Sequence, residues 1–117
     1  MADDWVSDQG ISYWCGGIGD ESLAQLKSAE GSADAQLVLT AGSGGNYLSD
    51  VKLSVSSADK KHTASWQATG PICLLKLPPG NFSVDANHGD EHRSARLTRK
   101  SAGTAKVQPL VINFKPD

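Results

Sequence analysis

The sequence predicts an all-β fold, an antiparallel β-sandwich of about seven short strands with one short α-helix near the N-terminus. Three observations lead to this prediction. Apolar and polar residues alternate with a period of two in several segments from residue 35 onward. Turn signals rich in glycine and proline separate these segments at intervals of about 8–12 residues. The chain has 117 residues, a usual size for one domain.

The N-terminal part of the chain differs from the rest. Residues 1–17 are rich in Asp, Gly and Ser and carry scattered aromatic side chains, so we expect a loosely ordered arm that docks at its aromatic end. Residues 18–31 are expected to contain a short helix packed on the domain, because acidic residues begin it and Leu23 and Leu26 share one face. Residues 32–117 are expected to form a single β-sandwich domain.

Seven later segments have the pattern of half-buried strands, with one apolar face and one polar face. Val51, Leu53 and Val55, for example, alternate with three polar residues. We expect strands at residues 35–41, 51–56, 62–68, 72–77 and 82–87, around residues 95–97, and at residues 110–114.

Two turns between these strands have clear chemical signals. Pro79 and Gly80 predict a type II turn, because proline presets φ at the first central position and glycine supplies the positive φ at the second. Gly89 and Asp90 predict a tight hairpin tip.

Charge and hydropathy exclude some partners. The formal net charge is −2 and the isoelectric point is near 5.8, whereas nucleic-acid binding depends on clustered Lys and Arg. A short basic cluster between residues 93 and 100 is offset by nearby acidic residues. No apolar run approaches the roughly 20 residues that a membrane helix needs. We therefore expect no nucleic-acid partner and no membrane span. The glycine-rich segments lack the dinucleotide-binding and P-loop patterns, and we expect no cofactor.

Cys15 and Cys73 bear on the compartment. They are far apart and form no Cys-x-x-Cys motif, so they predict either a disulfide or two buried free thiols. A disulfide would stabilise the fold by about 4 kcal/mol in the chain-entropy model. The chain begins without the charged and apolar regions of a signal peptide. It is therefore either cytosolic, or exported with its signal already removed.

Two segments together resemble carboxypeptidase regulatory-like domains, which are also called transthyretin-like domains. Residues 45–55 (GNYLSDVKLSV) are similar to the family's turn, bulge and alternating strand, with Asp50 in the turn. Residues 77–84 (LPPGNFSV) are similar to the family's Leu-x-Pro-Gly-x-Tyr-x-Val. The two motifs also follow one another at the family's spacing, which supports a transthyretin-like, immunoglobulin-like sandwich.

Residues 16–21 (GGIGDE) resemble a segment of small exported proteins of Gram-negative bacteria that carry this domain. The resemblance implies a periplasmic or secreted location, where a protein is exposed to host immunity as a possible antigen. It also argues against two enzyme classes. Zinc carboxypeptidases hold their metal in a separate domain, and transthyretin-like hydroxyisourate hydrolases end in a Tyr-Arg-Gly-Ser-like tail that this chain lacks.

One cluster has the side chains of a metal site: His88, Asp90, Glu91 and His92. Imidazole and carboxylate groups suit zinc, copper or nickel if they converge around the hairpin tip. The alternative is a solvated polar hairpin, because polar loop residues usually lie at the surface.

Aromatic residues give a second candidate site. Trp14 and Tyr47 are the candidates for stacking on a sugar, whereas Trp66 is expected in the core. No Gly-x-Ser-x-Gly motif is present, so no nucleophilic site stands out.

These observations favour a non-catalytic exported domain, expected to be a monomer that binds an unknown protein through a strand edge or through the loops at one end. The alternative is a protein that binds a carbohydrate or a metal, and an unrecognised hydrolase ranks last.

Overall fold

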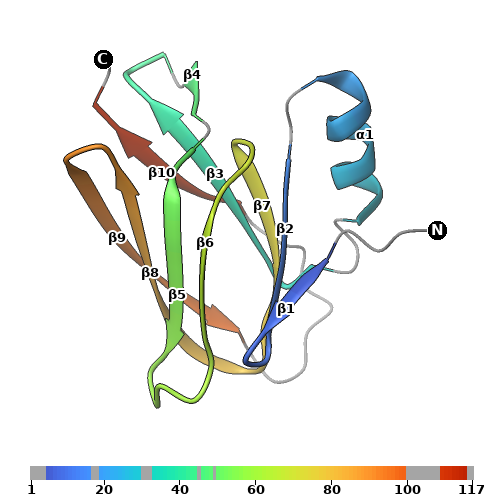
Figure 1. The fold of residues 1–117 in the computed structure, drawn as a ribbon, viewed down its shortest axis with the longest axis vertical. Coiled ribbons are helices and arrows are strands. Elements are labelled where there is room, and N and C mark those ends of the chain that lie inside the picture. The colour runs from blue at the N-terminus through green and yellow to red at the C-terminus, as the bar shows by residue number, and fades with distance from the viewer. Residues whose placement is uncertain are drawn as a thin grey trace.

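In the computed structural model, two β-sheets pack face to face and one helix packs on part of the outer face of the first sheet (Figure 1). The structure describes residues 5–16, 19–29, 33–44, 46–48, 50–99 and 109–115. These residues contain ten strands and one helix, so the predicted sandwich and helix are confirmed, with ten strands in place of about seven.

The first sheet has six strands. They are β1 (Val6–Asp8), β2 (Ile11–Gly16), β3 (Ala35–Ala41), β4 (Asn46–Tyr47), β7 (Ile72–Lys76) and β10 (Pro109–Phe114). Their order is β1-β2-β7-β3-β10, and the short β4 pairs with β3. The second sheet has the order β6-β5-β8-β9. Its strands are β5 (Lys52–Ser57), β6 (Thr63–Gln67), β8 (Gly80–His88) and β9 (Glu91–Arg99).

The prediction of a loosely ordered arm is wrong for residues 6–16, which form the β1–β2 hairpin. Gln9 and Gly10 both have positive φ, 47° and 85°, as a type I′ hairpin turn requires. Alternate residues of β2 face the interior, and β2 pairs with β7 along its length. Burial of these side chains and the pairing with β7 hold the segment in the sheet. Residues 1–4 and 17 of the predicted arm lie outside the described residues.

The predicted helix is present as α1 (Asp20–Ala29). Leu26 is 3% exposed and packs with Ile72 and Leu74 on the outer face of the first sheet, together with the partly buried Leu23. This cover explains why β7 is buried on both faces, whereas the strands of the second sheet alternate between buried and exposed residues.

The last strand departs from the predicted antiparallel arrangement. β10 pairs with β3 in parallel, from Pro109 opposite Gln36 to Phe114 opposite Ala41. The other strand pairs in the described part of the chain are antiparallel. Because Ile112 and Phe114 are buried between the sheets, β10 completes the core at the edge of the first sheet.

The two family-like turns position β5 and β8. Asp50 has φ 61°, its N–H donates to the carbonyl oxygen of Ala68, and the N–H of Ala68 donates to that of Val51. Two residues thus oppose one, which is a β-bulge at the start of β5. Gly80 has a positive φ of 142°, but the chain only bends at Pro79 and Gly80 already belongs to β8. A bend that leads directly into a strand replaces the predicted type II turn.

The β5–β6 turn is organised by Asp59. Its carboxylate accepts hydrogen bonds from the Ser57 hydroxyl and from the N–H of Lys61 at 3.0 Å. The Ser57 hydroxyl in turn accepts the N–H of His62. The bond from Ser57, followed by that from Lys61, lowers the pKa of the Asp59 carboxyl below its ordinary value.

We expect the stabilisation from the Asp59 charge to depend on pH. Because the folded pKa is lowered, this contribution is complete above the ordinary aspartate pKa of about 4 and is lost as the pH falls through the folded value. Asp59→Asn should therefore be less stable than the wild type at neutral pH, and the difference should close in acid. Urea unfolding of both proteins across a pH series measures it. A constant difference at every pH would contradict the role of the charge.

Candidate functional site

Cys15 and Cys73 form a disulfide between neighbouring strands of the first sheet. They lie directly opposite one another in the β2–β7 pair. Cys73 is fully buried, whereas Cys15 is partly exposed. The bond ties the β1–β2 hairpin to the central strand β7, and this resolves the open choice between a disulfide and two free thiols.

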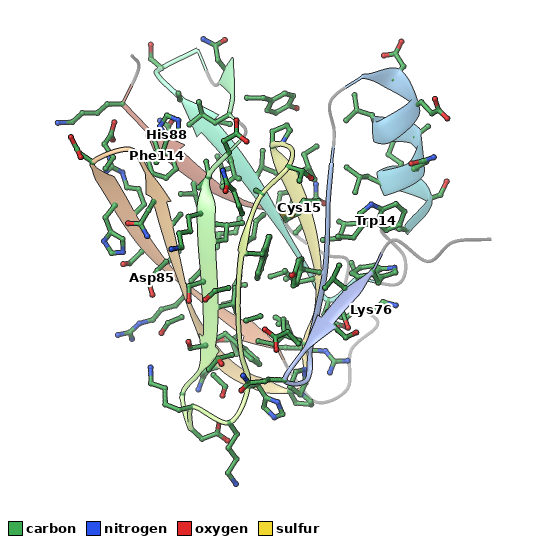
Figure 2. All side chains as sticks on the ribbon, viewed as in Figure 1. Trp14, Cys15, Lys76, Asp85, His88 and Phe114 are labelled. Atoms are coloured by element: carbon green, nitrogen blue, oxygen red, sulfur yellow. A yellow bond between two sulfur atoms is a disulfide. The ribbon has the colours of Figure 1, made fainter. Side chains whose placement is uncertain are left out.

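The predicted metal ligands do not converge. In the β8–β9 hairpin, His88 lies opposite Glu91 and Asn87 lies opposite His92, so the two histidines point to opposite faces of the sheet. His88 lies beside Phe114 (Figure 2), with a distance of 5.7 Å between the ring centroids. His92 Nε2 is 3.1 Å from Asp85 Oδ1. In the described part of the chain, which includes all four candidates, no three metal-ligand side chains come together. The metal-site prediction is therefore wrong.

Glu91 has a structural role in place of the predicted ligand role. Its Oε2 accepts hydrogen bonds from Arg93 Nη2 at 2.9 Å and from the N–H of Lys115 at 3.0 Å. Arg93 Nε donates to the carbonyl oxygen of Asn113 at 3.1 Å, and its guanidinium lies over the Phe114 ring. These contacts hold β10 beside β9 and close one side of the sandwich.

We expect Glu91→Ala to lower the free energy of unfolding by about 1 kcal/mol, because it removes two charge-assisted bonds at a partly exposed site. Hydrogen exchange at the Lys115 amide should also become faster. Asp90→Asn in the adjacent turn is the matched control, with an expected change within about 0.5 kcal/mol. Equal losses in the two variants would contradict the role of Glu91 in holding β10.

The two aromatic candidates lie in different places and form no common platform. Trp14 is partly buried on the outer face of the first sheet, where it packs near α1 and makes an edge contact with Trp5. Tyr47 is 61% exposed on β4. Trp66 is 9% exposed and belongs to the core, as predicted.

Trp66 joins the two sheets on the side opposite the β9–β10 contact. Its ring stacks on that of Tyr13 at a centroid distance of 4.0 Å and an interplanar angle of 8°. Its Nε1 donates to Cys15 Sγ at 3.1 Å. Tyr13 and Cys15 belong to β2, so β6 of the second sheet contacts β2 of the first sheet on this side through these side chains.

The first sheet extends beyond the second on this side. β1 continues the first sheet past β2, whereas β6 is the last strand of the second sheet. Val6 lies opposite Tyr13 in the β1–β2 pair, so its side chain is on the inner face, yet it is 49% exposed. In the described part of the chain, no strand of the second sheet covers it.

A groove with a volume of about 270 Å³ lies at this open side. Residues from β1, β2, β6 and the turn after β6 line it: Val6, Tyr13, Trp14, Cys15, Trp66, Gln67 and Thr69. We call the space opposite β1 and beside β6 the slot. The described residues that line it are uncharged, with apolar and aromatic surface on the first sheet and the backbone of β6 along its edge.

The edge of β6 carries backbone groups that are not used by β5. The N–H of Ser57 donates to the carbonyl oxygen of His62, and the N–H of Ala68 donates to that of Val51. Bonding alternates along an antiparallel strand, so Thr63, Ser65 and Gln67 direct their N–H and carbonyl groups away from β5. Among the described residues, no backbone partner meets these groups.

This site is not among the sites predicted from the sequence, although part of its signal is present there. Ile11, Tyr13 and Cys15 alternate, and that pattern could have revealed β2. The exposure of Val6 on the inner face of β1 could not be predicted in the same way. It follows from the order of strands in both sheets, which leaves no described strand of the second sheet opposite β1.

No helix in the described part of the chain has the length and apolar character needed to cross a membrane. Comparisons of the chain with protein-family models, with curated proteins and with solved structures give no match.

Proposed function

We propose that this protein is a non-catalytic binding domain that acts in the periplasm or outside the cell and contacts another protein at the open side of the sandwich. The observation that carries the proposal is the unpaired edge of β6 beside an uncharged groove. Proteins usually shield such an edge with charged residues, proline or a covering segment. The five residues of β6 include no charge and no proline.

The chemistry of the groove supports binding over catalysis. General acid–base catalysis needs a side chain whose pKa is matched to the working pH. The seven described residues of the lining offer one phenol, two indoles, an amide, a hydroxyl and a disulfide sulfur, and none of them is His, Asp, Glu or Lys. Such a surface suits recognition of apolar side chains and backbone.

An exported location is supported by the Cys15–Cys73 disulfide, because disulfides persist in oxidising compartments. Alkylation of the native protein in intact cells, followed by mass measurement, tests this part. We expect both cysteines to be protected until a reductant is added. Two alkylated thiols without reduction would contradict export.

Site-specific photo-crosslinking tests the binding function. A photoreactive amino acid at Gln67, on the open edge, is expected to give a discrete crosslinked protein in the exported fraction. The same amino acid at Ser83, which is exposed on the outer face of the second sheet, is the matched control. Absence of any product from both positions would contradict the proposal, and equal products from both would move the binding surface away from the groove.

A further inference from the structure

We propose that the slot beside β6 receives a single extended segment of another protein, which adds to the second sheet as a fifth strand opposite β1. This inference rests on the proposed function and names the kind of partner. Strand addition of this type uses main-chain hydrogen bonds for affinity and alternate side chains for specificity.

Backbone geometry favours antiparallel pairing of the segment with β6. Thr63, Ser65 and Gln67 each offer one N–H donor and one carbonyl acceptor to the slot. An antiparallel segment aligned with these three residues satisfies every one of these groups. Antiparallel pairing also continues the pattern of β5, β6 and β8 in this sheet.

Side-chain geometry fixes the composition of the segment. Successive side chains of an added strand point alternately inward and outward. Inward side chains meet Val6 and the edge of the Tyr13–Trp66 stack, so they should be apolar. Outward side chains continue the row of Thr63, Ser65 and Gln67, so they should be polar. The partner segment is therefore amphipathic with a period of two.

The layer structure excludes antiparallel pairing of β6 with β6 of a second copy of this chain. If β6 of another copy paired with β6 here, it would lie opposite β1. In the second copy, the Tyr13–Trp66 stack also holds β2 against β6. The β2 strand of the second copy would therefore have to occupy the space that β1 of the first copy fills. Two copies would overlap, whereas a lone strand has no second layer and fits.

Both ends of the slot are anchored, so it is formed before binding. At one end, Gln9 accepts a hydrogen bond from His62 Nδ1 at 3.0 Å, and Gly10 packs against the His62 ring. At the other end, Gly70 packs against the backbone of Gly16. These contacts keep β2 and β6 in place at both ends, so binding needs little rearrangement.

The test uses a synthetic probe, a capped peptide in which threonine and valine alternate, with a lysine at each end for solubility. Two N-methylated series separate strand addition from simple apolar contact. In antiparallel pairing, the threonine N–H groups face β6 and the valine N–H groups face away. Methylation of the threonine nitrogens should weaken binding by about tenfold or more, since it removes several hydrogen bonds, and methylation of the valine nitrogens should leave it within about threefold.

Amide NMR of the full chain provides the readout, with shifts and slowed hydrogen exchange expected at Thr63, Ser65 and Gln67. Val6→Asp should weaken the peptide by about tenfold, because it places a charge opposite apolar side chains. Val111→Asp is the matched control, since Val111 is 56% exposed on the outer face of the first sheet. That variant should bind like the wild type.

A reversed methylation pattern would mean that the segment runs parallel, and strand addition would stand. No binding of the unmethylated peptide, or equal binding of both methylated series, would overturn the inference. If crosslinks from Gln67 persist in that case, the binding function stands without strand addition. If they are also absent, both proposals fail.

Discussion

Replacing both Cys15 and Cys73 with alanine is expected to lower the free energy of unfolding by about 4 kcal/mol. The bond closes a loop with a sequence separation of 58, and such a crosslink restricts the unfolded chain strongly. A loss of this size is a large part of the roughly 5–15 kcal/mol that stabilises a typical domain. Urea unfolding of the two proteins measures the difference.

Two comparisons locate the origin of the effect. Wild-type protein that has been fully reduced should unfold at nearly the same urea concentration as the double-alanine variant, because both lack the crosslink. Replacement with valine fills the space left by the sulfur atoms and should recover only a small part of the loss. Unchanged stability of the double variant would mean that the bond adds nothing to the pairing of β2 with β7.

Trp66→Ala is expected to cost about 3–5 kcal/mol, the usual range for removal of a buried tryptophan. The change removes the stack on Tyr13 and the hydrogen bond to Cys15, which together join the sheets on their open side. It should also abolish binding of the alternating peptide, since the inner wall of the slot loses its support. Urea unfolding and peptide titration measure the two effects.

Tyr47→Ala is the control for an aromatic side chain outside the core. Tyr47 is 61% exposed, so its removal should change stability by no more than about 0.5 kcal/mol. Trp66→Phe retains a ring but not the N–H donor, and it should fall between the two alanine variants. If Trp66→Ala is no more harmful than Tyr47→Ala, then Trp66 does not hold the sheets together.

Most of the second sheet could be predicted from local pattern. Its inner residues, such as Leu53 and Val84, alternate with exposed polar ones because one face of this sheet is open to water. The first sheet is harder to predict, because α1 covers part of its outer face. In β2, Trp14 lies between Tyr13 and Cys15 and packs on the outer face of the sheet. No polar residue separates these three side chains, so the segment lacks the alternating pattern of a half-buried strand.

The error at the histidine hairpin could have been avoided. The predicted tip at Gly89 and Asp90 is present, and Gly89 has φ 61°. A two-residue turn places His88 opposite Glu91, and from that register the two histidines must point to opposite faces. The slot could not be predicted in this way. It requires the knowledge that β6 contacts β2, which no local pattern contains.

The strand order also determines when each sheet can assemble. The second sheet is built largely from hairpins between neighbours in sequence, β5 with β6 and β8 with β9. The first sheet joins β2 to β7 and β3 to β10, so it gathers segments from both ends of the chain. Contacts between distant residues form slowly because a long loop must close first. During synthesis, the apolar inner face of β3 therefore waits for the last strand, and this interval is when the chain is most exposed to aggregation.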